Sequence, residues 1–379
     1  MNHKPPKIDV LIIGGGLAGL SSAIHLSKAN LSVFVIEKNS YPKHKVCGEY
    51  ISNEVLPYLE FLDIDVFKLG AKKIDKFQLS TTKSKLIAST LPLGGFGISR
   101  FCLDHALAKK AIDVGVEILQ DSVETIEFLN DAFSVETKSV KQFKAKIVIG
   151  AYGKRSNLDI KLNRQFIKRK SPYLAVKTHV KGNFPDYVVA LHNFEGGYCG
   201  VSKVENESIN LCYITNFDAF KRYKDIEEFQ QKVLYKNTFL KDIFMNTKPV
   251  FDEPLTISQI SFDDKKPIEN HILMCGDTAA LIHPLSGNGM SMAMRSAQMA
   301  SLLIIKYFKS EIPNRKALEK QYLIEWNSAF KSRLITGHII ADLFNQPKLS
   351  EVLLQSLKWF PGILPYIIKK THGELMTTE

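Results

Sequence analysis

The fold is decided by residues 8–38, which read IDVLIIGGGLAGLSSAIHLSKANLSVFVIEK. Residues 8–13 form a short, largely apolar and β-branched run, which is typical of a parallel strand buried on both faces. A glycine-rich turn follows, then a helix expected at about 17–28 and a second strand at 32–36. The chain therefore opens with a strand–helix–strand unit of the kind that builds parallel sheets.

Three glycines in the turn have separate mechanical roles, and an acid ends the second strand. Gly14 permits the tight turn, Gly16 lets the backbone approach a pyrophosphate, and Gly19 lets the helix pack closely on the sheet. Glu37 can accept hydrogen bonds from an adenosine ribose and lies at the spacing of roughly 20 residues that this role requires. The pattern predicts binding of FAD or NAD, because an acid here favours a free 2′-hydroxyl over the phosphate of NADP.

The composition of the 379-residue chain excludes several classes of protein. Its 45% hydrophobic content is ordinary for a globular protein with room for two domains. The net charge of +11 suits an anionic substrate or membrane surface, but no basic run is interleaved with aromatic residues, so we expect no nucleic-acid partner. The five cysteines form no C-x-x-C pair, so no metal site is expected. Scattered cysteines and an N-terminus without a signal peptide predict a cytoplasmic protein.

A second strand–turn–helix unit lies far along the chain. Residues 271–276 return to the buried-strand pattern and end at Gly276-Asp277, and residues 283–290, HPLSGNGM, open a long helix expected at 289–308. A carboxylate at a strand end, such as that of Asp277, can bind a sugar-alcohol hydroxyl. The glycine-rich turn offers backbone N–H donors that can stabilise negative charge at the N1–C2=O edge of a reduced flavin.

These motifs, together with residues 100–104, RFCLD, resemble in their order the flavoproteins of the p-hydroxybenzoate hydroxylase fold. Residues 45–49, KVCGE, narrow the match, because they are similar to the cysteine–glycine motif of the geranylgeranyl-reductase-like branch. The resemblance spans about residues 8–308. It implies an α/β fold: a doubly wound, Rossmann-like FAD-binding domain, an inserted antiparallel β-sheet substrate domain and a helical C-terminus.

The expected domain boundaries follow from this resemblance and from the change of texture along the chain. Alternating polar and apolar residues predict antiparallel strands at 174–180, 187–191 and 208–215. We expect an FAD-binding part at 1–170 with an inserted hairpin at 73–91, a substrate domain at 171–262, the rest of the FAD-binding part at 263–310 and a helical region at 311–379.

The resemblance also implies where non-covalently bound FAD is held. Arg100 is expected near the pyrophosphate and ribityl chain, Asp277 at the ribityl hydroxyls, and residues 284–289 against the isoalloxazine. The full set of expected cofactor contacts is Gly14, Gly15, Gly16, Leu17, Ala18, Gly19, Glu37, Lys38, Gly48, Arg100, Val123, Gly276, Asp277, Pro284, Gly287, Asn288 and Gly289.

Two departures from the family pattern bear on the electron donor and the substrate. Tyr152 stands where the family often has the aspartate of a G-A-D-G motif, which puts a role of that loop in nicotinamide binding in doubt. Residues 197–202, GYCGVS, contain no tryptophan where the reductase branch has Tyr-x-Trp-x-Phe-Pro, so the family's long isoprenoid is not assured as substrate. NAD(P)H or another donor is expected to bind only transiently.

Four side chains are candidates for the chemistry. Cys47 is expected beside the flavin, although a lone cysteine often serves only for packing. Glu49 could donate or accept a proton, or merely begin a helix. Tyr198 could be an acid or a core residue, and His283, before a proline, could act in catalysis or only shape the turn.

Three functions remain open. The favoured one is an FAD-dependent oxidoreductase that transfers a hydride through flavin N5 to or from a carbon–carbon bond of an apolar or carrier-bound substrate. The alternatives are an FAD-dependent monooxygenase that uses NAD(P)H and oxygen, and a flavin-binding protein without turnover. The apolar, lysine-flanked stretch at 359–370 is interpreted as a helix that caps the FAD domain or as a peripheral membrane contact.

Overall fold

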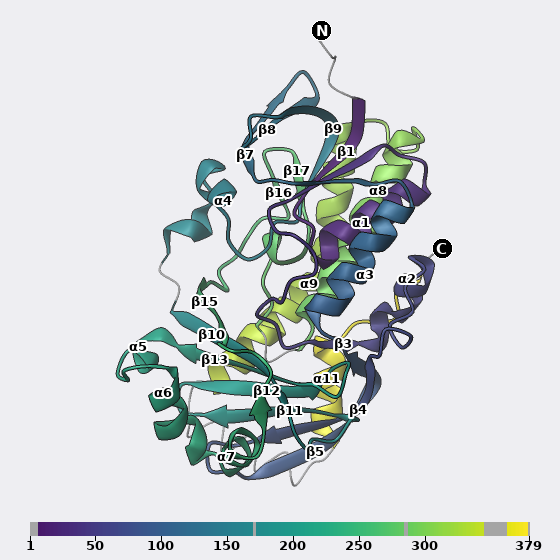
Figure 1. Cartoon of the computed structure of the whole chain (residues 1–379). Helices are drawn as coiled ribbons and strands as arrows, with labels where there is room; N and C mark the ends of the chain where they lie inside the picture. The colour runs from purple at the N-terminus through teal and green to yellow at the C-terminus, as the bar shows by residue number, and fades with distance from the viewer. Residues whose placement is uncertain (1–6, 170–171, 284–286, 345–361, 378–379) are drawn as a thin grey trace.

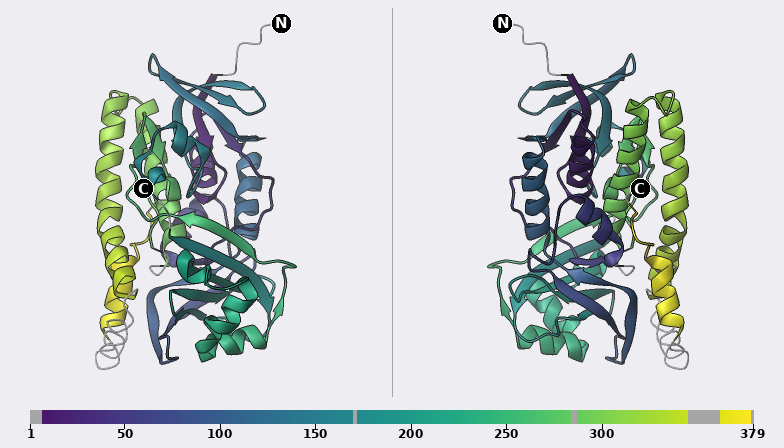
Figure 2. Two further views of the ribbon diagram at one scale, coloured as in Figure 1. Left: turned by 90° about the vertical axis from the view of Figure 1, so that its left-hand side faces the viewer. Right: turned by 90° about the vertical axis from the view of Figure 1, so that its right-hand side faces the viewer.

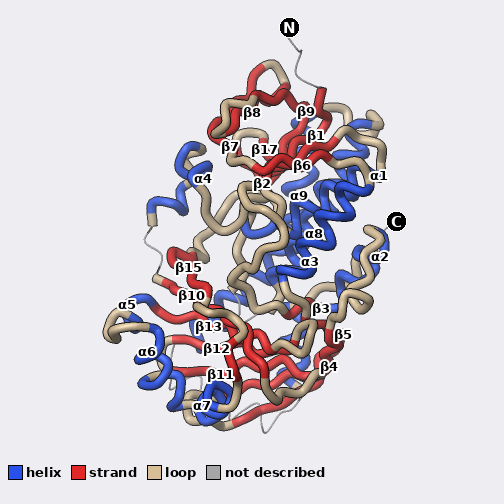
Figure 3. The backbone as a smooth tube through the Cα atoms, viewed as in Figure 1, coloured by secondary structure: helices blue, strands red, loops and turns tan. Residues whose placement is uncertain are grey.

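The computed structural model describes residues 7–169, 172–283, 287–344 and 362–377. Two β-sheets lie at opposite ends of the molecule, and irregular segments concentrate between them (Figures 1 and 3). This arrangement confirms the expected α/β class with two sheets. The site described below occupies the space between the sheets.

The first sheet is the doubly wound one, with strand order β16-β17-β9-β1-β2-β6. Pairs β1–β2, β1–β9, β2–β6 and β9–β17 are parallel, and a β7–β8 hairpin extends the sheet beside β9. Its strands are β1 (Lys7–Ile13), β2 (Val33–Glu37), β6 (Glu117–Gln120), β7 (Val123–Leu129), β8 (Ala132–Thr137), β9 (Gln142–Gly150), β16 (Ile268–Glu269) and β17 (Ile272–Met274).

A row of long helices packs beside this sheet (Figure 2). Helix α1 (Leu17–Lys28) contacts both α3 (Arg100–Asp113) and α8 (Gly289–Phe308), and α8 contacts α9 (Arg315–Phe344). The apolar strands β1, β9 and β17 and the inner faces of α1 and α8 form one buried core, as the sequence pattern predicted. Shorter helices are α2 (Leu56–Phe61) and α4 (Asn157–Lys161).

The second sheet has nine strands in the order β14-β10-β13-β12-β11-β4-β5-β3, with β15 also paired to β10. The hairpin expected at 73–91 forms, but it belongs to this sheet and not to the FAD-binding part, because β4 pairs with β11. The strands are β3 (Tyr50–Ser52), β4 (Lys72–Ser80), β5 (Leu86–Gly97), β10 (Tyr173–Lys181), β11 (Val188–Phe194), β12 (Gly197–Lys203), β13 (Ile209–Asn216), β14 (Lys248–Pro249) and β15 (Leu255–Ile260). The domain boundaries given above stay predictions.

The two faces of the second sheet have different neighbours. Alternate residues of β10, such as Leu174 and Val176, share a core with α6 (Ile226–Lys232) and α7 (Thr238–Met245), and α5 (Phe217–Phe220) lies beside them. Because side chains alternate along a strand, Lys177 and His179 point to the opposite face. That face looks towards the first sheet.

The C-terminal part adds α11 (Ile363–Thr371), which packs on β5 and α9. The residues 359–361 of the proposed membrane contact lie outside the described residues, so that contact stays a prediction. Within the described part of the chain, no helix has both the length and the apolar character that a bilayer span requires.

Candidate active site

A cavity of about 840 Å³ lies between the two sheets. One end is lined by the glycine turn after β1, by the end of β2 and by residues 43–50. The other end is lined by the inner face of the second sheet and by α11. A space of this size lies in the range of small-molecule and cofactor sites.

The glycines after β1 differ in what surrounds them. A Cβ on Gly14, where φ is +103°, would lie 2.3 Å from the carbonyl oxygen of Ala151, and one on Gly19 would lie 1.9 Å from that of Gly14. These two glycines therefore allow backbone segments to touch, as predicted. A Cβ on Gly16 would instead meet only Arg100 Nη2 at 3.4 Å and Lys45 Nζ at 3.8 Å. Gly16 thus borders an open approach flanked by two cations.

The two cations are fixed by one buried carboxylate. Arg100 donates to both oxygens of Asp104, at 2.7 and 2.8 Å, and Lys45 Nζ donates to Asp104 Oδ2 at 2.8 Å. Burial alone would raise the pKa of Asp104, but Arg100 and Lys45 outweigh it and hold the pKa below its ordinary value. Two positive charges held by one negative charge leave a net positive charge beside Gly16, which suits a pyrophosphate.

The carboxylate of Glu37 lies against the glycine turn. Its Oε2 accepts the Gly15 N–H at 2.7 Å, and its Oε1 accepts the backbone and side-chain N–H groups of Asn39 at 2.9 and 2.8 Å. The Tyr41 hydroxyl donates to the Gly15 carbonyl at 2.6 Å. Glu37 also lines the cavity. The predicted ribose-binding acid therefore supports the turn as well, a contact that the sequence did not reveal.

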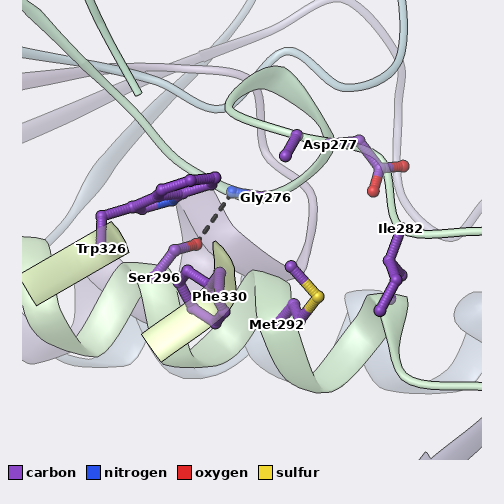
Figure 4. A pocket seen from close by; sticks show the side chains of 9 residues that line it. Gly276, Asp277, Ile282, Met292, Ser296, Trp326 and Phe330 are labelled. Atoms are coloured by element: carbon purple, nitrogen blue, oxygen red, sulfur yellow. Dashed lines mark hydrogen bonds between the residues drawn. The ribbon is translucent and has the colours of Figure 1, made fainter. Parts of the chain in front are cut away.

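The turn after β17 joins both halves of the site. Gly276, with φ of +61°, donates its N–H to Ser296 Oγ at 2.9 Å, and a Cβ there would lie 3.3 Å from those of Ala18 and Ala293. Figure 4 shows Trp326 and Phe330 of α9 beside this turn. Asp277 lines the cavity, and no described residue donates a hydrogen bond to its carboxylate. This leaves it able to accept hydrogen bonds from sugar-alcohol hydroxyls.

The carbonyl groups of residues 45–48 all accept hydrogen bonds from side chains. Lys177 donates to Lys45 O at 3.1 Å and Lys154 to Val46 O at 3.4 Å. Asn210 Nδ2 donates to Cys47 O at 3.2 Å and to Gly48 O at 2.9 Å.

The same segment leaves donors and space on its other side. Within the described residues, the N–H groups of Val46, Cys47 and Gly48 have no hydrogen-bond partner, and all three residues line the cavity. A Cβ on Gly48 would meet no atom within 4 Å. Unpaired backbone donors beside an open glycine suit a flat, acceptor-rich ring. The residues therefore fit FAD on both its phosphate and its flavin sides.

Glu49 occupies a different environment from that of a proton donor. Its side chain is fully buried, one oxygen is bonded to Lys177 and to the Arg100 N–H, and the other lies 2.7 Å from His179 Nε2. Burial would raise the pKa of Glu49, but His179 and Lys177 outweigh it and lower the pKa. A carboxyl that stays ionised does not favour a role as general acid.

The other three candidates for chemistry lie at or near the cavity. Cys47 Sγ is 3.4 Å from Met290 Sδ, and Cys47 and Tyr198 both line the cavity. The Tyr198 hydroxyl is buried without a partner in the described structure, and burial raises its pKa well above the ordinary value. His283 does not line the cavity but its ring lies 6.3 Å from that of Tyr198, and burial lowers its pKa to about 4.

Most of the predicted cofactor residues meet at the cavity. Those that line it are Gly16, Leu17, Ala18, Glu37, Lys38, Gly48, Arg100, Gly276, Asp277, Gly287, Asn288 and Gly289. Gly14, Gly15 and Gly19 shape the turn behind its surface. Val123, at the start of β7, does not line the cavity, and Pro284 lies outside the described residues.

The end of the cavity at the second sheet is apolar. Ala175, Val189, Leu191 and Ile214 of the sheet line it, and α11 adds Leu364, Ile367 and Ile368. Further apolar lining comes from Phe77, Leu79, Leu91, Leu255, Ile257, Ile260 and Leu281. The cavity therefore joins a polar, cationic end to an apolar end.

Sequence reasoning assigned no role to Lys45, Lys177, His179 or Asn210. One local signal existed for two of them: Lys177 and His179 stand two residues apart in a strand, which places both on one face. Their partner in the fold, Glu49, precedes them in the sequence by 128 and 130 residues. No sequence pattern reports such a contact.

Comparisons with known proteins agree with this geometry. A family model described as FAD dependent oxidoreductase (DAO) matches residues 9–46. The chain is 23% identical over 354 residues to conditioned medium factor receptor 1 of Dictyostelium discoideum, covering 85% of this chain and 68% of that protein. It is 25% identical over 346 residues to digeranylgeranylglycerophospholipid reductase of Methanosarcina acetivorans, covering 88% and 82%.

A solved structure has the same fold. The flavin-dependent brominase Bmp2 superposes with a TM-score of 0.80 at 18% identity, over 97% of this chain and 93% of that one. The fold, the geometry around Gly16, Gly48 and Asp277, and the family model over the first strand–helix–strand unit all point to one cofactor. The chain is an FAD-dependent oxidoreductase that, among flavoproteins of this fold, resembles the geranylgeranyl reductases.

Proposed function

We propose that this protein reduces a carbon–carbon double bond in an apolar, unsaturated chain. The observation that carries the proposal is the apolar end of the cavity, which is continuous with the end that fits FAD. FAD, when bound and reduced, would supply the hydride. The apolar wall from the second sheet and α11 excludes water and holds an alkenyl chain along the cavity. The similarity to the digeranylgeranylglycerophospholipid reductase of Methanosarcina acetivorans supports this substrate class.

The residues at the polar end would hold the cofactor. Arg100 and Lys45 would neutralise the pyrophosphate beside Gly16, Glu37 would bind the ribose, and Asp277 the ribityl hydroxyls. The N–H groups of Val46, Cys47 and Gly48 would donate to the flavin ring. NAD(P)H is proposed as the electron donor that reduces the flavin again after each turnover.

Reduction of a double bond also needs a proton, and we assign it to Tyr198. Tyr198 lines the cavity, and its hydroxyl is buried without a hydrogen-bond partner in the described part of the chain. Because burial keeps its pKa far above neutrality, Tyr198 holds its proton until a neighbouring carbon becomes basic. Cys47 is the second candidate for this role.

The experiment compares Tyr198→Phe with Tyr187→Phe, which changes a tyrosine that is 54% exposed. We expect Tyr198→Phe to lower kcat for alkene reduction by about a hundredfold or more while FAD content stays unchanged, and Tyr187→Phe to behave as the unchanged protein. Equal kcat values for both variants would remove Tyr198 from the mechanism.

The same preparation tests the alternative function, an FAD-dependent monooxygenase that uses NAD(P)H and oxygen. NAD(P)H oxidation is followed with and without oxygen, in the presence of unsaturated isoprenoids. The proposal expects turnover without oxygen and a product that has gained two hydrogens. Turnover that requires oxygen and adds an oxygen atom to the product would establish the monooxygenase instead.

A further inference from the structure

We propose that Lys177 and His179 of the second sheet are positioning residues for the FAD site and act through Glu49. Neither residue lines the cavity, so neither can touch the cofactor or the substrate directly. They hold the segment at residues 45–49 and the first turn of α3, from which the cofactor-binding groups project. The inference rests on the FAD site and not on the identity of the substrate.

Glu49 is held from strand β10 and from helix α3 at once. Its Oε1 is bonded to Lys177 Nζ and, at 2.8 Å, to the N–H of Arg100, and its Oε2 to His179 Nε2 at 2.7 Å. Its backbone has φ of +54°, in the left-handed region that residues other than glycine rarely adopt. A conformation of this kind persists only where its surroundings impose it. Lys177 and His179 impose it here, because they fix the side chain from β10.

Because Glu49, Lys177 and His179 are buried, the stability of the fold depends on their pairing. The exposed fractions of Glu49, Lys177 and His179 are 0, 0 and 4%. Removing one partner of a buried ion pair leaves an uncompensated charge, which costs far more than a surface pair contributes. The His179 ring is fixed further by Phe251, at a centroid distance of 4.9 Å, and by His44 at 5.1 Å.

The cluster controls both cations that flank Gly16. The backbone N–H of Arg100 donates a hydrogen bond to Glu49. The backbone carbonyl of Lys45 accepts a hydrogen bond from Lys177 Nζ at 3.1 Å. The side chains of Arg100 and Lys45 then meet on Asp104. A shift of Glu49 therefore moves the two cations proposed to bind the pyrophosphate, and it also moves the Cys47–Gly48 peptides proposed to bind the flavin ring.

The first test compares two substitutions of one residue. His179→Gln keeps an N–H donor near the position of Nε2, whereas His179→Leu removes it. We measure the FAD dissociation constant by fluorescence titration, the visible absorbance spectrum of bound flavin, and the melting temperature of the apoprotein. We expect His179→Leu to weaken FAD binding by about tenfold and to shift the flavin spectrum, and His179→Gln to restore both.

The matched control is His192→Leu on β11. His192 is also buried, at 1% exposed, and it does not line the cavity. Its Nδ1 lies 2.9 Å from Ser80 Oγ. We expect this variant to lose apoprotein stability but to keep the FAD dissociation constant and the flavin spectrum. If His192→Leu and His179→Leu changed FAD binding equally, or if His179→Leu changed neither FAD binding nor spectrum, the positioning role would be overturned.

The second test uses the pair of charges. Glu49→Gln and Lys177→Met each leave one buried charge unpaired, so both should lower the melting temperature of the apoprotein. The double variant removes both charges and should regain most of that stability. We expect its FAD affinity to stay about tenfold weaker, because the bonds to Arg100 and Lys45 are altered. Recovery of FAD affinity together with stability would show that the cluster serves folding alone.

Neither test of the cluster needs a substrate, so their outcomes are independent of the test of alkene reduction.

Discussion

At the scale of single residues, the glycines of one motif serve two purposes that the motif itself does not distinguish. Gly14 and Gly19 are required by the protein's own backbone, since a Cβ at either would overlap a carbonyl oxygen. Gly16 has no such contact and faces Arg100 and Lys45 at ordinary distances. Its small size serves the approach of a ligand.

This difference predicts opposite outcomes for Gly14→Val and Gly16→Val. Gly16→Val should give a colourless protein whose apoprotein melting temperature is close to that of the unchanged protein, because only the pyrophosphate approach is filled. Gly14→Val should lower the melting temperature of the apoprotein itself, since the clash with Ala151 is with backbone and φ is positive. FAD content and thermal melts of the two apoproteins check this. A yellow Gly16→Val protein would contradict the placement of the pyrophosphate.

Glu37 also belongs to this scale. Glu37→Ala should weaken FAD binding by roughly ten- to a hundredfold, since a hydrogen bond to a charged group contributes about 1.5–3 kcal/mol. The bond from Gly15 to Glu37 adds a smaller loss through the turn. Flavin titration measures the affinity, with the exposed Glu127→Ala as control. Equal affinities for both variants would exclude the ribose contact.

At the scale of elements, local patterns predicted the strands and helices better than their partners. The hydrophobic period predicted a helix at 289–308, which is α8 with the same bounds. The hairpin at 73–91 also formed, but alternation within a hairpin does not say which sheet its edge will join. Its pairing with β11 is a contact between segments over 100 residues apart. Strand β12 and helix α7 were not predicted as elements.

The residues of the site also fall into those that local sequence patterns predict and those that they do not. The glycine turns, Glu37 and Asp277 could be predicted because each stands at a fixed offset from a strand or helix end, and Arg100 could be predicted from the family resemblance. The pairing of Glu49 with Lys177 and His179 could not, because it joins residues 128 and 130 positions apart in the sequence that only the folded chain brings together. The proton-donor hypothesis for Glu49 lost support for that reason.

Helix α11 gives a prediction at the same scale, because it forms one wall of the cavity. Leu364, which is 6% exposed, lines the cavity, whereas Tyr366, which is 61% exposed, does not. Leu364→Trp should raise KM for the longest alkenyl substrates by roughly tenfold, since overpacking costs about 1–3 kcal/mol, and leave FAD content unchanged. Tyr366→Trp is the control. If chain-length preference were the same in both variants, α11 would not bound the substrate site.

At the scale of the whole molecule, buried histidines make stability depend on pH. Burial lowers the pKa of His25, His192 and His283 to about 4, with a further contribution from Lys28 at His25 and from His338 at His283. Between about 6.5 and 4 the unfolded chain binds protons at these sites and the folded protein does not, so stability falls as pH falls through this window.

His25→Gln tests the sign of this effect. The variant keeps a group able to bond the Tyr58 hydroxyl, which lies 3.1 Å from His25 Nδ1, but it does not titrate. Its free energy of unfolding should fall less between pH 6.5 and 4 than that of the unchanged protein, by on the order of 3 kcal/mol. Urea unfolding at several pH values measures it, with the exposed His105→Gln as control. Parallel curves for all three proteins would contradict the effect.

The proposed function requires that one cavity holds FAD at one end and an unsaturated apolar chain at the other. The most direct measurement is a single turnover without oxygen: the FAD-loaded protein is reduced with dithionite, freed of excess reductant and mixed with an unsaturated isoprenoid. We expect the yellow colour of oxidised flavin to return and the isoprenoid to gain two hydrogens. Flavin that stays reduced until oxygen is admitted, with an isoprenoid that is unchanged or carries an added oxygen atom, would contradict it.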